Sequence, residues 1–193
     1  METSIDYYFS VASPWSYLGS ERFIGIARRY DVPVKVIPLD LTRVFAASGG
    51  LPYEKRSAQR RSYRQVELDR WSRKLGVPVT LEPRYYPVDR RPASYLLIAA
   101  RRERGDVLNL SHAILRAIWH EERNLADWST LTDIADQEGL NGRALVRAAQ
   151  DISVAREHER DTDHAIAAQV FGAPTYIIDG ELFWGQDRLG FLE

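Results

Sequence analysis

The segments with strand character lie at the two ends of this chain, and helical patterns fill the sequence between them. Near the N-terminus, Ser4 to Ser10 and Pro33 to Leu39 are rich in aromatic and β-branched residues, as strands usually are. The stretch from Pro14 to Tyr30, which separates them, has a helical pattern. Two strands joined by a helix predict a βαβ unit with parallel strands and a right-handed crossover.

Near the C-terminus the sequence predicts a β-hairpin. Asp179-Gly180 stands between the short apolar runs Thr175 to Ile178 and Glu181 to Trp184, and Asp-Gly in such a place is a strong hairpin signal. A closing helix is expected to begin near Gln186.

The middle of the chain contains a series of predicted helices. They cover Arg56 to Leu75, Ala93 to Arg104, Ser111 to Glu122, a short segment ending at Gln150, and Ile152 to Val170. Thr130 with Asp133 resembles a capping box, and Asn141 is expected to cap the short helix.

Length and composition fit one globular domain, because 193 residues with 45% hydrophobic content can bury a real core. Since sheet-forming segments flank the helical block, we expect one α/β domain built from residues 1–40 and 169–193. Residues 41–168 would then form an all-helical insertion within it.

Charge and residue usage exclude several function classes. The 26 basic and 27 acidic residues nearly cancel, so we expect no binding to nucleic acid or to anionic membranes. No apolar run is long enough to span a bilayer and no secretion signal stands at the start, which makes the cytoplasm the expected location. Cysteine is absent, so any thiol chemistry must use a bound thiol.

The junction between the first strand and the first helix carries Ser13-Pro14. Serine is a favoured N-cap and proline a favoured first helical residue, so this pair has an ordinary structural interpretation. The functional interpretation uses the same geometry, because a helix N-terminus attracts anions and a serine hydroxyl there can donate a hydrogen bond to a thiolate. The motif alone leaves both interpretations open.

A second signal, Ala173-Pro174, precedes the predicted hairpin. A trans proline opening an edge strand is the ordinary interpretation, whereas a cis bond would turn the backbone of Ala173 toward the helix that starts at Pro14. A strand–helix junction with serines at 13 and 16, followed far downstream by Ala-Pro-Thr, is the layout of a thioredoxin-like active site. We therefore predict that Pro174 is cis.

These two end motifs resemble those of 2-hydroxychromene-2-carboxylate isomerases and kappa-class glutathione transferases. The resemblance rests on Phe9 to Gly19 at one end and on Val170 to Thr175 with Phe183 to Leu189 at the other. It implies a thioredoxin-like α/β fold of the DsbA kind with a large all-helical insertion, in which serine replaces the redox cysteines. It also implies glutathione as cofactor, a small-molecule substrate from aromatic catabolism and a homodimer.

The resemblance assigns roles to individual residues. The residue matching Ser13 contacts the glutathione sulfur, and that matching Ala173, beside Pro174, pairs its backbone with the cysteinyl part. Gln186 and Asp187 match residues that hold the γ-glutamyl end, with Arg188 nearby. The activity implied is isomerisation through a thiolate at Ser13. Release of the conjugate, as in a transferase, and non-catalytic binding of a thiol or peptide beside Pro174 are the alternatives.

The match departs from the family in the segment Leu41 to Tyr53, which aligns with a loop. Ala46 and Gly50 stand where the family usually has a lysine and an asparagine that contact substrate and glutathione. Tyr86 and Asp89, in a proline-bracketed loop, are candidate substrate-binding residues, although loop aromatics can equally pack on the helical block.

The sequence contains two further groups of polar residues with a possible site role, arginines and histidines. Arg56, Arg60 and Arg64 recur at four-residue steps, which favours a solvated helix face over a wall that attracts carboxylate substrates. The four histidines show no metal-binding spacing, so no metal site is expected. They are His112, His120, His158 and His164.

Overall fold

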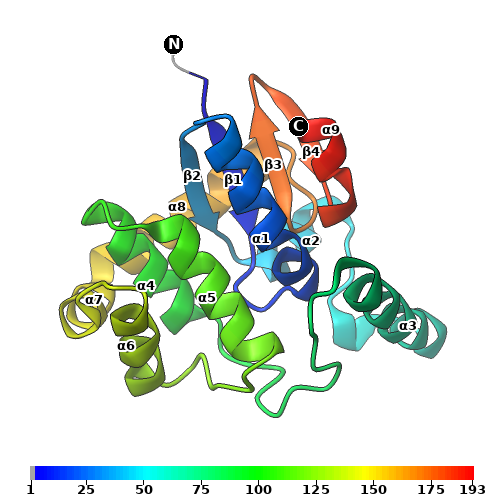
Figure 1. The fold of residues 1–193 in the computed structure, drawn as a ribbon, viewed down its shortest axis with the longest axis horizontal. Coiled ribbons are helices and arrows are strands. Elements are labelled where there is room, and N and C mark those ends of the chain that lie inside the picture. Colours follow the sequence, from blue (N-terminus) through cyan, green and yellow to red (C-terminus); the bar gives the residue numbers. More distant parts are fainter. Residues whose placement is uncertain (1–2) are drawn as a thin grey trace.

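The computed structural model describes residues 3–193, which form a mixed sheet surrounded by helices (Figure 1). The strands are β1 (Ile5–Phe9), β2 (Val34–Pro38), β3 (Thr175–Ile178) and β4 (Glu181–Trp184), in the spatial order β2-β1-β3-β4. The helices are α1 (Pro14–Arg29), α2 (Leu41–Ser48), η1 (Tyr53–Lys55), α3 (Ala58–Leu75), α4 (Arg91–Arg102), α5 (Val107–Trp119), α6 (Trp128–Gln137), α7 (Gly142–Ala149), α8 (Ile152–Ala167), η2 (Gln186–Arg188) and α9 (Leu189–Leu192).

The sheet joins the two ends of the chain. Strand β1 pairs parallel with β2 and antiparallel with β3, and β3 pairs antiparallel with β4. The predicted βαβ unit and hairpin are therefore both confirmed. At the hairpin turn Asp179 and Gly180 both have positive φ, at 50° and 83°, as a tight two-residue turn requires.

Helices cover both faces of the sheet, and β1 shows the division by strict alternation. Tyr7 and Phe9 point into the larger core, which they share with Phe23 of α1 and with buried residues of α4 and α5. Tyr8 points to the opposite face, into a smaller core with residues of β2, α2 and α8 such as Val44. The central strand is thus buried on both sides.

Within the described residues, the span 41–168 contains helices and no strand, which confirms the predicted α/β class with a helical insertion. In Figure 1, α4 to α7 gather on one side of the molecule and α3 stands at the opposite side. The proposed division between residues 1–40 with 169–193 and residues 41–168 stays a prediction. None of the helices in residues 3–193 is both long enough and apolar enough to cross a membrane.

Two local predictions were wrong. The segment expected to be a loop after Leu41 forms α2, because Asp40 caps it by accepting a hydrogen bond from the Thr42 amide at 2.9 Å. Helix α6 starts before the predicted capping box, since Asp127 is its N-cap and Thr130 lies inside its first turn.

Candidate functional site

The site is built around the N-terminus of α1. Ser13 is the N-cap of this helix, and its Oγ accepts a hydrogen bond from the Ser16 amide at 3.2 Å. The side chain is only 5% exposed, yet it lines a cavity of about 230 Å³, which we call the inner cleft. Because the cap uses the lone pairs of Oγ, the Ser13 hydroxyl proton stays available for a ligand.

The second component is the loop before β3. The Ala173-Pro174 bond is cis, as predicted, and Ala173 lines the inner cleft together with Ser13. The Pro174 carbonyl accepts a hydrogen bond from the Gly185 amide at 2.9 Å, which ties this loop to the start of η2. The tertiary structure thus brings the two sequence motifs to one cavity.

The helix N-terminus supplies a further donor. Pro14 has no N–H, the Ser13 amide bonds to the carbonyl of Ser10 and the Ser16 amide bonds to Ser13. Trp15 lines the inner cleft, and its amide N–H has no hydrogen-bond acceptor among the described residues. This amide and the Ser13 hydroxyl can therefore both donate to an anion held at the positive end of α1.

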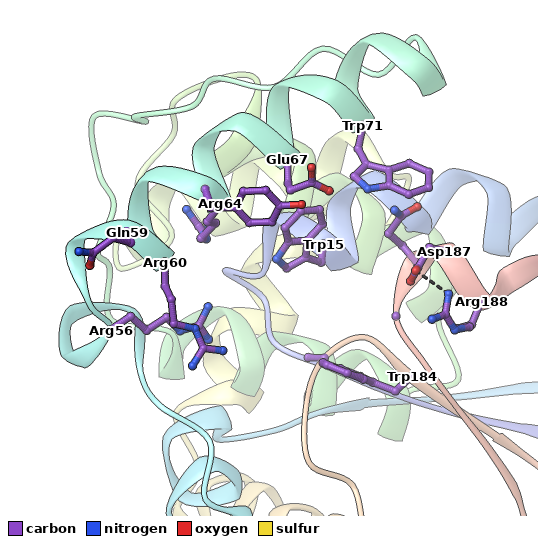
Figure 2. Close-up of a pocket in the computed structure, with 14 residues that line it drawn as sticks. Trp15, Arg56, Gln59, Arg60, Arg64, Glu67, Trp71, Trp184, Asp187 and Arg188 are labelled. Carbon is purple, nitrogen blue, oxygen red and sulfur yellow. Dashed lines mark hydrogen bonds and ion pairs between the residues drawn. The ribbon is translucent and has the colours of Figure 1, made fainter.

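Next to the inner cleft lies a larger one, of about 720 Å³, which we call the outer cleft. Gln186, Asp187 and Arg188 of η2 line it, as does Ala173. Gln186 is 2% exposed, and both its carbonyl and its side-chain oxygen accept hydrogen bonds from Arg22 of α1. Asp187 and Arg188 form an exposed ion pair of 2.6 Å in the cleft wall (Figure 2).

Helix α1 can approach η2 this closely because position 19 is glycine. A Cβ added at Gly19 would lie 2.7 Å from Cβ of Gln186, which is closer than two carbon atoms can pack. Gly19 therefore helps to set the position of Gln186 in the outer cleft.

This combination of a capped helix, a cis-proline loop and a helical insertion can be compared with known proteins. Residues 4–193 match the family model described as the DSBA-like thioredoxin domain. The chain belongs to the DsbA-like thioredoxin family. A 2-hydroxychromene-2-carboxylate isomerase from Sphingobium xenophagum is 29% identical over 194 residues, covering 100% of this chain and 97% of that protein.

Two further comparisons agree with this assignment. A glutathione S-transferase kappa 1 from Caenorhabditis elegans is 22% identical and covers 95% of this chain and 86% of its own length. A solved structure of 2-hydroxychromene-2-carboxylate isomerase has a TM-score of 0.84 at 26% identity, covering 97% of this chain and 91% of that one. The resemblance predicted from the end motifs is therefore confirmed.

In this DsbA-like protein the two serines near the start of α1 differ in their surroundings. Ser13 lines the inner cleft, whereas the Oγ of Ser16 is buried and has no hydrogen-bond partner within residues 3–193. The first serine is therefore the one that can meet a ligand.

The arginines of the predicted basic stripe differ in their exposure. All three line the outer cleft, but Arg60 is exposed to solvent, as predicted for a solvated helix face, and Arg56 lies before the start of α3. The interpretation as a solvated face was wrong for Arg64, which is buried. Arg64 is 8% exposed, and burial is the main cause that lowers its pKa. Arg64 and Leu68 are the buried residues of α3, and their four-residue spacing is the signal that could have indicated an inward-facing arginine.

The two candidate substrate-binding residues separate in the structure. Tyr86 lines the inner cleft, and burial raises the pKa of its hydroxyl. Asp89 lies outside the linings of both clefts and forms an exposed ion pair of 2.7 Å with Arg91. Asp89 was a candidate for the pocket, but its carboxylate instead accepts a hydrogen bond from the Arg91 amide at the start of α4.

Histidines take no part in either cleft. His112 bonds to the Ser20 hydroxyl at 2.8 Å, and His158 packs edge-on against Tyr95. Across residues 3–193 no three histidine or acidic side chains gather in a way that could hold a metal ion.

Proposed function

We propose that this protein is a glutathione-dependent isomerase of conjugated carbonyl compounds, with the thiolate held at Ser13. The observation that carries the proposal is the meeting of the Ser13 N-cap and the cis Ala173-Pro174 loop in one cleft, in a chain that has no cysteine. The isomerase relatives cover nearly the whole chain, which supports the same activity.

Glutathione is proposed to lie across the two clefts as an extended peptide. Its cysteinyl part would pair with the backbone of Ala173, and its γ-glutamyl end would reach η2 in the outer cleft. There the carboxylate of Asp187 suits the ammonium group, while Arg188 suits the α-carboxylate. Gln186, fixed by Arg22, would position this end of the peptide.

The sulfur would sit at the N-terminus of α1. The Ser13 hydroxyl and the Trp15 amide donate to it, and the helix dipole favours its negative charge. These interactions stabilise the thiolate relative to the thiol, so the pKa of bound glutathione falls. The bound cofactor is then a nucleophile near neutral pH.

The proposed reaction is reversible addition. The thiolate forms a C–S bond to the conjugated substrate, the C=C bond becomes single, and the electron pair moves to the carbonyl oxygen. Rotation about the new single bond follows. The electron pair then returns, the C–S bond breaks and the double bond forms again with the other geometry, so glutathione leaves unchanged.

A transferase is the second candidate, favoured by the relative named glutathione S-transferase kappa 1. Both reactions share the adduct and differ only in its fate. We also expect, on the family resemblance, a homodimer in the cytoplasm.

Calorimetric titration with glutathione, followed by turnover of a panel of unsaturated keto acids, tests the proposal. An isomerase changes the ultraviolet spectrum of the acid while the glutathione concentration stays constant, and a transferase consumes glutathione and yields a conjugate by mass spectrometry. Absence of glutathione binding would refute both the isomerase and the transferase proposals. Binding without turnover of any electrophile would indicate a non-catalytic module.

A further inference from the structure

Arg64 is a buried cation without a counter-ion. It is 8% exposed, and within residues 3–193 its guanidinium has neither an ion-pair partner nor a hydrogen-bond acceptor. Its neighbours are aromatic rings: the guanidinium carbon lies 4.7 Å from the ring centre of Tyr53, 6.0 Å from that of Tyr86 and 5.8 Å from that of Trp119.

A buried guanidinium without a counter-ion lowers the stability of the folded protein. Arginine stays charged in proteins, and a charge taken out of water without a partner destabilises the fold unless something compensates for it. Cation–π contacts return part of this cost, but none of the N–H donors of the guanidinium meets an acceptor within residues 3–193. An anion supplied by a ligand would satisfy them.

The position of Arg64 indicates where that anion would be. Arg64 lines both the inner cleft, with Ser13, and the outer cleft, with η2, and so stands at their junction. Figure 2 shows Arg56, Arg60 and Arg64 together on one side of the outer cleft, across from Asp187.

The acidic side chains that line the two clefts do not neutralise the arginines around Arg64. Glu67 pairs with Arg70 at 2.7 Å and Asp187 pairs with Arg188, so both carboxylates are engaged elsewhere. Glu54 lines the inner cleft, but it is exposed to solvent.

Phe45 of α2 also lines the inner cleft. A Cβ added at Gly50 would lie 2.3 Å from the Phe45 ring, so a larger residue at position 50 would require that ring to move. The family's lysine and asparagine, absent at Ala46 and Gly50, are thus replaced by an aromatic surface.

We propose that Arg64 is a specificity-determining residue that binds a carboxylate at the junction of the two clefts, next to the sulfur site at Ser13. The planar guanidinium can bind a carboxylate through two parallel hydrogen bonds, and the rings of Tyr53, Tyr86 and Phe45 suit a flat conjugated group attached to it. The substrate class is therefore a small planar conjugated acid. This inference rests on the proposed function, but the carboxylate could also be the glycyl end of glutathione.

The test uses binding of trans-cinnamate, with the neutral trans-cinnamamide as its matched analogue, followed by tryptophan fluorescence. Trp15 and Trp184 line the inner cleft and report on its occupancy. Arg64→Met should weaken cinnamate binding by about tenfold to one hundredfold, because a hydrogen bond to a charged group is lost. The affinity for the neutral cinnamamide should change by no more than about twofold. Arg64→Lys should retain part of the affinity.

Two controls separate binding from structure. Arg73→Met removes an exposed arginine of the same helix, paired with Asp69, and should leave cinnamate affinity unchanged. The Tm of Arg64→Met should stay the same or rise, since the variant buries an apolar chain in place of an unpaired charge. A lower Tm with unchanged affinity for both cinnamate and glutathione would overturn the proposal and make Arg64 a structural residue.

A second pair of ligands identifies the source of the carboxylate. If glutathione provides it, Arg64→Met weakens glutathione but not its glycine ethyl ester; if the substrate provides it, only the cinnamate pair responds. Either result supports an anion site at Arg64, and no response in either pair overturns it. Failure of the proposed function would look different, because wild-type protein would then bind no glutathione while the cinnamate comparison still tests Arg64.

Discussion

Replacing Ser13 by alanine should affect the chemistry far more than the fold. The change removes the N-cap of α1 and leaves the buried Ser16 amide without its acceptor at 3.2 Å. A lost cap costs about 1 kcal/mol, and an unsatisfied buried donor costs about 1–3 kcal/mol. Against a total of about 5–15 kcal/mol for a typical domain, the variant should still fold.

The effect on bound glutathione follows from the same hydroxyl. Losing a hydrogen bond to a charged sulfur removes about 1.5–3 kcal/mol of thiolate stabilisation. This corresponds to a rise of about one to two units in the pKa of the bound thiol. The Trp15 amide and the helix dipole remain, so the thiol should keep part of its acidity.

The assay is the ultraviolet absorbance of bound thiolate as a function of pH, in wild-type protein and in Ser13→Ala. Ser16→Ala is a matched control, because it removes a buried hydroxyl of the same helix that has no hydrogen-bond partner among the described residues. Only the first variant should shift the titration and move the pH–rate profile to higher pH. Superimposable curves for wild type and Ser13→Ala would refute the catalytic role and leave Ser13 as a cap alone.

Two further predictions concern packing and pH. Gly19→Ala should destabilise the protein by about 1–3 kcal/mol and weaken glutathione binding, because its methyl group would displace Gln186. Gly25→Ala, in the same helix with nothing within 4 Å, should instead be neutral or stabilise by up to about 1 kcal/mol; urea denaturation and calorimetry measure both. Burial lowers the pKa of His158 below 6.5, so the unfolded chain takes up a proton before the folded protein does. Stability should be full above that value and fall as the pH decreases through the folded pKa, and His158→Gln should reduce this loss of urea resistance.

The Gly19 and His158 predictions can each be contradicted by a specific result. Equal glutathione affinity in Gly19→Ala and Gly25→Ala would mean that η2 does not position the cofactor. An unchanged acid response in His158→Gln would assign that response to other groups, of which the half-buried His112 is one, since desolvation lowers its pKa too.

Local sequence signals were sufficient where the structure itself is local. Helix α1 begins at Pro14 because Ser13 satisfies an amide of its first turn, and the hairpin closes at Asp179-Gly180 because both residues tolerate positive φ. The same reasoning failed for α2 and for the start of α6. In both cases an aspartate N-cap outside the expected signal, Asp40 or Asp127, determines where the helix starts.

The site depended on contacts that no local pattern contains. That Ser13 and Ala173 share a cleft could be expected only from a family resemblance, because β1 and β3 must pair before the two ends meet. Arg64 shows the limit most clearly. Its sequence neighbours are those of a solvated helix face, and it is buried only because η1, the Tyr86 loop and α5 close over it with Tyr53, Tyr86 and Trp119. Periodicity and capping residues in the sequence therefore predicted the order of strands and helices. Packing between segments far apart in the chain decided which charged side chains are buried, and therefore where an anion can bind.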